Sequence, residues 1–345
     1  MDAANVIRSN SLKYQQNGAG FSPAALYASH KNLVEAEIQR FVPEGYPVSL
    51  YQPIRYALTA GGKRIRPVLV LLATEAVGGT TARALPAAVA MELLHTFTLI
   101  HDDIIDRADL RRGHPTIHVK WNTNTALLAG DALIALAYKS LLKTATPRLP
   151  EIASVFTKAL SEVCEGQASD TEFEERMRVS FDDYISMISK KTGAFIVASL
   201  WIGALIGNGG DDEIAALRRY GEALGRAFQL QDDLLDITGS ETSLGKPVGA
   251  DLLEGKKTAP LIMALKRARG KEKDLLQSIV RRGKAYPREI SRVKRLYEKL
   301  GVLKDIQHII DESVREANSE LLFLHESNAR RTLRWLAETL ARRTC

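Results

Sequence analysis

The stretch Leu85–Asp106, with the sequence LPAAVAMELLHTFTLIHDDIID, decides the fold class of this 345-residue chain. Its apolar residues recur at spacings of three and four, which is the period of a buried α-helix. Glu92, His95 and His101 interrupt the stretch, so it lacks the roughly 18 uninterrupted apolar residues of a membrane span. The stretch therefore predicts a long helix inside a folded domain, ending in three carboxylates.

Those carboxylates have a spacing that suits metal binding. Asp102 and Asp106 are four residues apart and share a helix face, with Asp103 beside them. A second apolar stretch carries the same spacing in Asp232, Asp233 and Asp236. One such cluster would fit a solvated acidic face equally well, but two clusters late in apolar helices need compensating cations. We predict that the clusters face each other and bind Mg²⁺, which prefers carboxylate and phosphate oxygens.

The rest of the chain is also predicted to be helical. Apolar spacings of three and four recur in several further stretches: 33–42, 126–142, 152–163 and 214–237. Gly and Pro residues separate these stretches, and no segment of useful length alternates like a half-buried strand. We therefore predict one all-α domain over residues 23–345, preceded by a flexible lead-in at residues 1–22.

Composition restricts the compartment and the partners. The chain has only two cysteines, Cys164 and Cys345, and no hydrophobic leader, which favours a reducing cytoplasm. Its net charge of +6 suits an anionic small substrate, and equally nucleic acid or an acidic membrane. Because no basic block is interleaved with aromatic residues, we predict no binding of nucleic acid.

Cations in glycine-rich segments are candidates for binding phosphate groups. Gly61–Pro67 joins two glycines to the three cations Lys63, Arg64 and Arg66. Arg111 and Arg112 follow the first carboxylate cluster closely. Glycine lets a backbone approach a phosphate, and Lys and Arg supply charge-assisted hydrogen bonds. Further candidates are Lys190, Lys191, Thr192, Lys246, Lys256 and Lys257. Each motif alone also fits a solvated surface, but together with the carboxylates they predict a site for two diphosphates bridged by metal.

His95 lies seven residues before Asp102, on nearly the same helix face. A histidine there fits a hydrogen-bonded core residue as well as a ligand contact, and the sequence leaves both open.

Taken in order, these motifs resemble the trans-isoprenyl diphosphate synthase (polyprenyl synthetase) family, from about residue 23 to the end. The matching segments are 62–67, 95–106, 111–113, 166–170, 191–192, 228–236, 245–247 and 255–258. The resemblance implies long, mostly antiparallel helices around a deep central cavity, usually in a homodimer. It also implies Mg²⁺-dependent condensation of isopentenyl diphosphate with an allylic diphosphate, which would be dimethylallyl, geranyl or farnesyl diphosphate.

The resemblance further assigns roles to motif residues. Two Mg²⁺ ions on the allylic diphosphate would be held by Asp102, Asp103 and Asp106, and a third by Asp232 with Asp233 and Asp236. The allylic diphosphate would also contact Arg111, Lys191, Lys246 and Lys256. Isopentenyl diphosphate would bind Lys63, Arg66, His95 and Arg112. The reacting allylic carbon and the cationic transition state would lie near Gln229 and Thr192.

In this family the residues just before the first cluster set the product length, here Leu94, Phe97 and Thr98. Spacing places Thr98 one turn before Asp102, whereas the role of Phe97 as the floor of the tail cavity rests on the resemblance. One aromatic residue without an insertion resembles microbial geranylgeranyl diphosphate synthases. We therefore predict a C20 product, with C15 and C25 as alternatives.

Two other functions stay open at this point. A class I terpene cyclase shares the first carboxylate motif, but its second motif normally mixes Asn, Ser and Glu. A non-catalytic prenyl-binding or regulatory subunit usually loses one cluster. Both clusters are complete in this chain, which favours the prenyltransferase.

Overall fold

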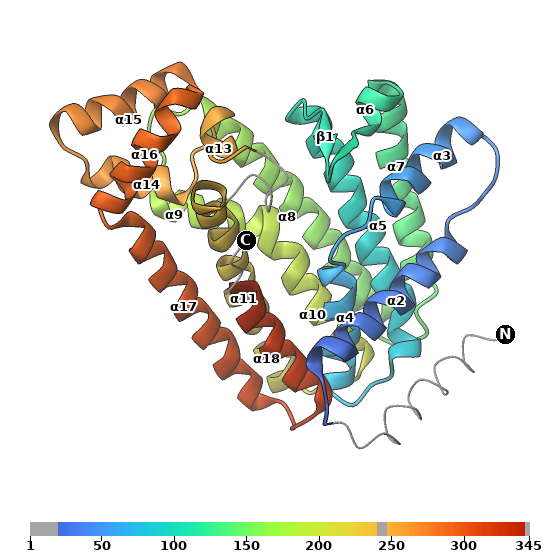
Figure 1. The fold of residues 1–345 in the computed structure, drawn as a ribbon. Helices are drawn as coiled ribbons and strands as arrows, with labels where there is room; N and C mark the ends of the chain where they lie inside the picture. The colour runs from blue at the N-terminus through green and yellow to red at the C-terminus, as the bar shows by residue number, and fades with distance from the viewer. Residues whose placement is uncertain (1–19, 240–246, 342–345) are drawn as a thin grey trace. The chain divides into compact units, whose positions relative to one another are not determined.

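The computed structural model describes residues 20–239 and 247–341, and nearly all of them are helical (Figure 1). The elements are α2 (Pro23–Phe41), α3 (Val48–Thr59), α4 (Ile65–Ala76), α5 (Thr81–Ile105), β1 (Leu110–Arg111), β2 (His114–Pro115), α6 (Ile117–Lys120), α7 (Thr123–Leu141), α8 (Leu149–Glu175), α9 (Phe181–Ile188), η1 (Ser189–Gly193), α10 (Ala194–Ile206), α11 (Asp211–Thr238), α13 (Ala250–Leu253), α14 (Ala259–Arg267), α15 (Gly270–Arg282), α16 (Pro287–Lys299), α17 (Val302–Glu320), η2 (Leu321–Phe323) and α18 (Asn328–Ala341). The predicted all-α class is confirmed.

The predicted apolar stretches form the longest helices. The two carboxylate clusters lie late in α5 and α11, as their sequence positions predicted. The predicted flexible lead-in lies almost entirely outside the described residues, and α2 begins at Pro23 with Ser22 as its N-cap.

The chain divides into two compact units. The first comprises residues up to Val155 together with Ser199–Leu217 and Phe323–Trp335. The second comprises Phe156–Ala198, Arg218–Leu322 and the residues from Leu336 onward. The single domain and the deep central cavity stay predictions.

In the first unit, α5 packs against α4 and α7. Both α4 and α5 bury almost every residue in their central turns, because their sequences are apolar around the whole helix. The middle and C-terminal turns of α4 also approach α10 closely. A side chain at Gly203 would overlap the Val70 carbonyl, and the Thr74 hydroxyl donates a hydrogen bond to the Gly203 carbonyl at 2.9 Å.

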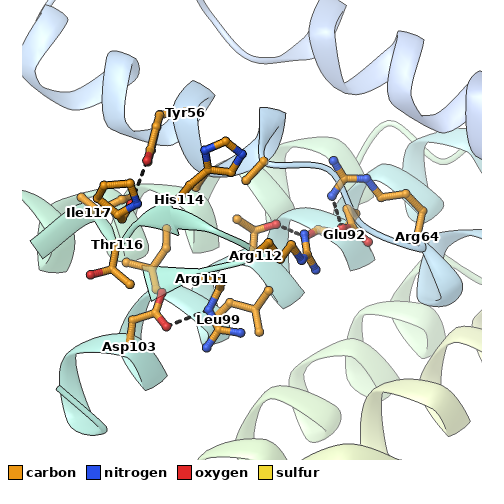
Figure 2. Close-up of a pocket in the computed structure, with 15 residues that line it drawn as sticks. Tyr56, Arg64, Glu92, Leu99, Asp103, Arg111, Arg112, His114, Thr116 and Ile117 are labelled. Carbon is orange, nitrogen blue, oxygen red and sulfur yellow. Dashed lines mark hydrogen bonds and ion pairs between the residues drawn. The ribbon is translucent and has the colours of Figure 1, made fainter. Parts of the chain in front are cut away.

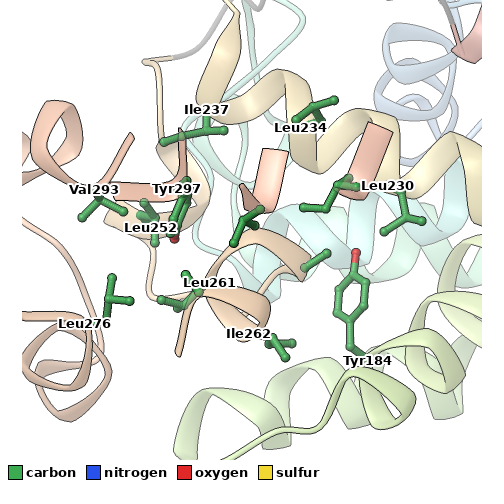
Figure 3. Close-up of a cluster of buried hydrophobic side chains, with 14 of the residues drawn as sticks. Tyr184, Leu230, Leu234, Ile237, Leu252, Leu261, Ile262, Leu276, Val293 and Tyr297 are labelled. Atoms are coloured by element: carbon green, nitrogen blue, oxygen red, sulfur yellow. The ribbon is translucent and has the colours of Figure 1, made fainter. Parts of the chain in front are cut away.

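The second unit has its own core, drawn in Figure 3. Leu230 and Leu234 of α11 contribute to it together with Leu261 of α14 and Val293 of α16. The ring of Tyr184 is also fully buried there. This core fixes the end of α11, which carries the second carboxylate cluster.

Two apolar segments are long enough to cross a membrane by length and composition, Thr81–Ile105 and Phe181–Ile206. The apolar character of Thr81–Ile105 is explained by burial in the core, since 72% of its apolar window lies inside the structure. The core helix of a globular protein passes the same test.

Candidate active site

The first carboxylate cluster occupies the last turn of α5. The Asp106 N–H donates to the Asp102 carbonyl at 2.8 Å, so the helical spacing that places these two side chains on one face is present. Asp103 is buried, and its Oδ1 accepts a hydrogen bond from Arg111 Nε at 2.7 Å. Burial raises the pKa of Asp103, and the charge of Arg111 opposes that rise. Asp103 therefore holds Arg111 beside the other two carboxylates.

A short hairpin, β1–β2, places Arg111 and Arg112. The two turn residues, Arg112 and Gly113, have φ angles of 54° and 77°, as a two-residue hairpin turn requires. The Arg112 guanidinium donates to the Gly61 carbonyl, and a side chain at Gly62 would lie 2.7 Å from it. The structure thus brings Arg112 to the glycine loop that the sequence marked as a phosphate site. The hairpin was not predicted from the sequence, where its signal was the pair Arg112-Gly113.

Arg66 and His95, both predicted to bind isopentenyl diphosphate, lie together. Arg66 Nη1 is 3.1 Å from His95 Nε2. Because arginine can only donate, Nε2 must accept, and the ring proton must be on Nδ1. Burial and then the positive charge of Arg66 lower the pKa of His95 well below its ordinary value of 6.5. His95 is therefore a neutral member of a cationic group.

A buried ion pair supports this loop, and it was not predicted, since Arg64 was grouped with the candidate phosphate-binding cations. Arg64 has a φ of 54° at the N-cap of α4, and its guanidinium donates to Glu92 Oε1 and to the Leu58 carbonyl, each at 2.5 Å. Both side chains of the pair are almost fully buried. The anchored Arg64 stands between Lys63 and Arg66, so it fixes the backbone from which those two residues extend.

Arg64 and Glu92 line a cavity of about 490 Å³, a volume that includes its open mouth. Figure 2 shows this cavity in close-up. Arg111, Arg112 and Asp103 line the same cavity. A buried glutamate in the middle of an apolar helix was the available sequence signal, since such a charge needs a partner.

The three residues predicted to set product length are buried in α5: Leu94, Phe97 and Thr98. The Phe97 ring packs edge-on against His101, with 4.7 Å between the ring centroids. His101 in turn fills the space over Gly130 of α7, where any side chain would overlap it. The position of the Phe97 ring is therefore restricted by its neighbours.

In the second unit, Lys191 and Thr192 belong to a π-helical turn, η1, rather than to a regular α-helix. Lys191 Nζ donates to Asp170 Oδ2 of α8 at 2.5 Å. A side chain at Gly166, one turn before Asp170, would overlap the backbone of Lys191. The predicted motif Gly166–Asp170 thus supports η1 through a close backbone approach and an ion pair. Such π-turns are frequent at functional sites.

Thr192 begins a chain of hydrogen bonds that runs into the second cluster. Its hydroxyl is 2.7 Å from Gln229 Oε1, and Gln229 Nε2 donates to Asp233 Oδ1 at 3.0 Å. Asp233 Oδ2 accepts from the Tyr184 hydroxyl and, at 3.1 Å, from the Ala259 N–H. Burial, with a smaller effect of Asp251, raises the pKa of Asp233 to about 7. Protein donors thus surround both oxygens of Asp233.

The other predicted members of the second unit differ in exposure. Asp232 is half-buried, whereas Asp236 is buried and its Oδ2 accepts from the Asp251 N–H at 3.3 Å. Lys256 pairs with Glu254 at 3.0 Å. Its neighbour Lys257 donates to the last carbonyls of α8, at Phe173 and Glu174, as a helix C-cap. Lys246 lies outside the described residues.

A family model described as polyprenyl synthetase matches residues 47–300. The chain belongs to the polyprenyl synthetase family. The geranylgeranyl diphosphate synthase of Methanosarcina mazei is 40% identical over 312 residues, covering 90% of this chain and 94% of that protein. The geranylfarnesyl diphosphate synthase of Natronomonas pharaonis is 35% identical over 335 residues, covering 92% and 96%.

A solved structure is similar over the same extent. The geranylgeranyl pyrophosphate synthetase of Pyrococcus horikoshii superimposes with a TM-score of 0.88 at 39% identity, covering 93% of this chain and 99% of that one. The predicted family is thereby confirmed, and as a polyprenyl synthetase the chain is a prenyltransferase.

Proposed function

We propose that the chain condenses isopentenyl diphosphate with an allylic diphosphate and yields mainly the C20 product, geranylgeranyl diphosphate. The observation that carries the proposal is the family match together with two intact carboxylate clusters. The neighbouring cations support it further. Arg66, His95 and Arg112 are gathered at one glycine loop of the first unit, and Lys191 and Thr192 share one turn of the second.

We propose Mg²⁺ as the metal, with separate ions held by the first cluster, chiefly Asp102 and Asp106, and by the second cluster, chiefly Asp232. Among residues 20–239 and 247–341, no three His, Cys, Asp or Glu side chains form a ready cage for a metal ion. This fits Mg²⁺, which typically takes one or two carboxylates and completes its shell with phosphate oxygens and waters. All candidate donors are oxygens, as a hard cation prefers. When bound, Mg²⁺ would stabilise negative charge on the diphosphate leaving group.

The protein residues carry out the other parts of the reaction. Lys63, Arg66 and Arg112 bind the diphosphate of isopentenyl diphosphate, and Arg111, Lys191, Lys246 and Lys256 bind that of the allylic substrate. The allylic C–O bond breaks and its electron pair leaves with the diphosphate. The double bond of isopentenyl diphosphate then attacks the allylic cation and forms the new C–C bond. The proton lost afterwards goes to the departed diphosphate.

Thr192 and Gln229 supply oxygen dipoles that favour positive charge on the allylic carbon. The apolar walls of α5 exclude water, which would otherwise capture the cation. No covalent intermediate with a protein nucleophile is required.

The test is a turnover assay with isopentenyl diphosphate and C5, C10 or C15 primers, with and without a chelator. We expect Mg²⁺-dependent chain elongation and a fall of at least about 10³-fold in kcat for Asp102→Asn. Hydrocarbon release from geranylgeranyl diphosphate alone would identify a terpene cyclase instead. Failure to elongate any primer would favour a non-catalytic prenyl-binding protein.

We further propose a homodimer in the cytoplasm. Leu127 and Leu128 of α7 are 41% and 60% exposed, and adjacent exposed leucines favour contact with another subunit. Light scattering on the purified protein would give the mass, and a monomeric mass at micromolar concentration would refute the dimer.

A further inference from the structure

Helix α16 carries a row of cations opposite its buried side. Its buried face consists of Ile290, Val293, Leu296 and Tyr297. Its exposed face carries Arg288, Arg292, Arg295 and Lys299. The spacings of four, three and four place these side chains within about 60° of the helix circumference. We call these four residues the basic face.

The turn from α15 into α16 extends the basic face. Arg281 and Lys284 are exposed in or next to this turn. Tyr286, 41% exposed, carries the Arg282 guanidinium 4.7 Å and the Arg288 guanidinium 5.6 Å from its ring centroid. An aromatic ring with cations on it is the kind of group that settles at a membrane–water interface.

The positive charge of the protein is concentrated in the segment that contains α15 and α16. Residues 266–299 contain 13 Lys and Arg against 4 Asp and Glu, a net charge of +9, so the remaining residues sum to −3. Two of the four acids pair within the segment, with Arg282 and with Lys299. Within the described chain, Arg288, Arg292 and Arg295 have no carboxylate oxygen within 4.0 Å. Their charge is therefore available to an anionic surface.

We propose that the basic face docks this enzyme on an anionic lipid bilayer. Clustered Lys and Arg are attracted to anionic headgroups, and a flat row on one helix fits a flat charged surface. The choice of partner also rests on the proposed function, because a C20 diphosphate product is amphipathic and partitions into bilayers. Nucleic acid fits less well, since single-strand binding uses several stacking aromatics and Tyr286 is the one exposed ring of this segment.

The experiment is co-sedimentation of the full chain with vesicles of phosphatidylcholine, with or without about one third phosphatidylglycerol. The variant Arg288→Glu/Arg292→Glu/Arg295→Glu reverses the basic face. The matched control Arg40→Glu/Lys158→Glu/Arg315→Glu makes the same change of net charge at exposed positions on α2, α8 and α17. We expect salt-sensitive binding to the anionic vesicles, at least about tenfold weaker in the first variant and retained in the control.

Either of two results would overturn the docking proposal: no binding of the unchanged chain to anionic vesicles, or equal loss in both variants. Binding of single-stranded RNA in place of vesicles, lost with the basic face, would assign the surface to nucleic acid. Chain elongation in detergent-free buffer is measured in parallel. The docking variants should keep it, and its absence in the unchanged chain would refute the proposed function separately.

A second inference follows from the hydrogen bonds of Asp233. A carboxylate only accepts, so Gln229 must turn its NH₂ group to Asp233 and its carbonyl to Thr192. The Thr192 hydroxyl must then donate its proton to Gln229. Only oxygen lone pairs of Thr192 remain for other contacts. Asp233 therefore determines which groups donate and which accept in the hydrogen bonds that link it to Gln229 and Thr192.

We infer that Asp233 is a positioning residue that keeps the negative end of the Thr192 hydroxyl available to the allylic cation. The inference rests on the proposed role of Thr192. The two donors on Asp233 Oδ2, Tyr184 and the Ala259 N–H, keep the carboxylate in place. Both lie in the second unit with Thr192 and Gln229.

Asp233→Asn tests this direction, because the substitution exchanges donor and acceptor in each of these hydrogen bonds while the side chain keeps its shape. The new side chain keeps its oxygen for Tyr184 and Ala259, so its NH₂ group faces Gln229, which must rotate. Thr192 then accepts from Gln229, and its own proton points outward. For this variant kcat should fall about 100-fold while the KM values change little. Tyr184→Phe leaves the direction intact and should cost less than about tenfold.

A double-mutant cycle separates this role from a structural one. In a Thr192→Val background, Asp233→Asn should lower kcat no further, because no hydroxyl remains to be turned. An undiminished loss in that background would refute the inference. A raised Mg²⁺ requirement at unchanged kcat would instead make Asp233 a metal ligand. Lack of turnover in the unchanged protein would refute the proposed function itself.

Discussion

Phe97 is the residue whose size should limit the length of the product. Its ring is buried and packs against His101. His101 fits against α7 because Gly130 has no side chain there. The ring has little room to move aside, so removing it should open space of several carbon atoms for the growing chain. Phe97→Ala should therefore shift the products to lengths beyond those of the unchanged enzyme. Chromatography of the dephosphorylated products measures this.

The control for that change is Phe41→Ala, at the half-buried end of α2. It should leave the product distribution as it is. If Phe97→Ala also gave unchanged lengths, Phe97 could not be the floor of the tail site.

Glu92 should stabilise the first unit through its buried pair with Arg64. Glu92→Gln leaves a buried guanidinium without its compensating charge, which typically costs about 3 kcal/mol of unfolding free energy. The matched change Glu35→Gln removes a more exposed carboxylate 3.6 Å from the same guanidinium and should cost less than about 1 kcal/mol. Denaturant titration of both variants measures the difference. Equal losses of unfolding free energy in the two variants would show that the buried pair stabilises the fold no more than the exposed one.

At the residue scale, the sequence identified which side chains carry chemistry but few of their partners. The acid clusters and the cations follow from spacing and charge alone. The bond from Arg111 to Asp103 depends on a hairpin eight residues away, and the bond from Thr192 to Gln229 joins two helices far apart in the chain. Such contacts are set by tertiary packing, which a local pattern does not encode.

At the scale of elements, η1 should depend on the absence of a side chain at Gly166. A methyl group there would overlap the backbone of Lys191. Gly166→Ala should therefore displace the turn that carries Lys191 and Thr192 and lower kcat by at least about tenfold. Gly45→Ala, where a methyl group meets open space, is the control and should leave kcat unchanged. Steady-state kinetics of both variants tests this prediction. Full activity of Gly166→Ala would show that η1 does not depend on the missing side chain at Gly166.

The helices themselves were predictable, because their apolar spacing persists over many turns. The hairpin at Arg111–His114 and the π-turn at Ser189–Gly193 were not. The hairpin depends on two positive φ angles, and the π-turn interrupts a continuous helical pattern from Phe181 to Ile206. Short features of this kind leave almost no periodic signal.

At the scale of the molecule, the two compact units could not be read from the sequence. Their boundaries all fall inside helices: α8, α10, α11, η2 and α18, after Val155, Ala198, Leu217, Leu322 and Trp335. Domain boundaries are usually recognised by linkers rich in Gly, Pro and polar residues. Helices that continue through a boundary between the units provide no such signal, so the units could not be recognised in the sequence, and the single domain stays a prediction.

The stability of the whole molecule should fall in mild acid because of His95. Its pKa in the folded protein is well below 6.5, through burial and the charge of Arg66. Below about pH 6.5 the unfolded chain therefore binds a proton at His95 that the folded protein does not, and the proton favours unfolding. The contribution is fully present above that pH and decreases by up to about 1.4 kcal/mol per pH unit below it. His95→Gln keeps a polar side chain that does not titrate. Urea unfolding at neutral and mildly acidic pH should show a smaller loss for this variant, and equal slopes would mean that His95 is not kept neutral by the fold.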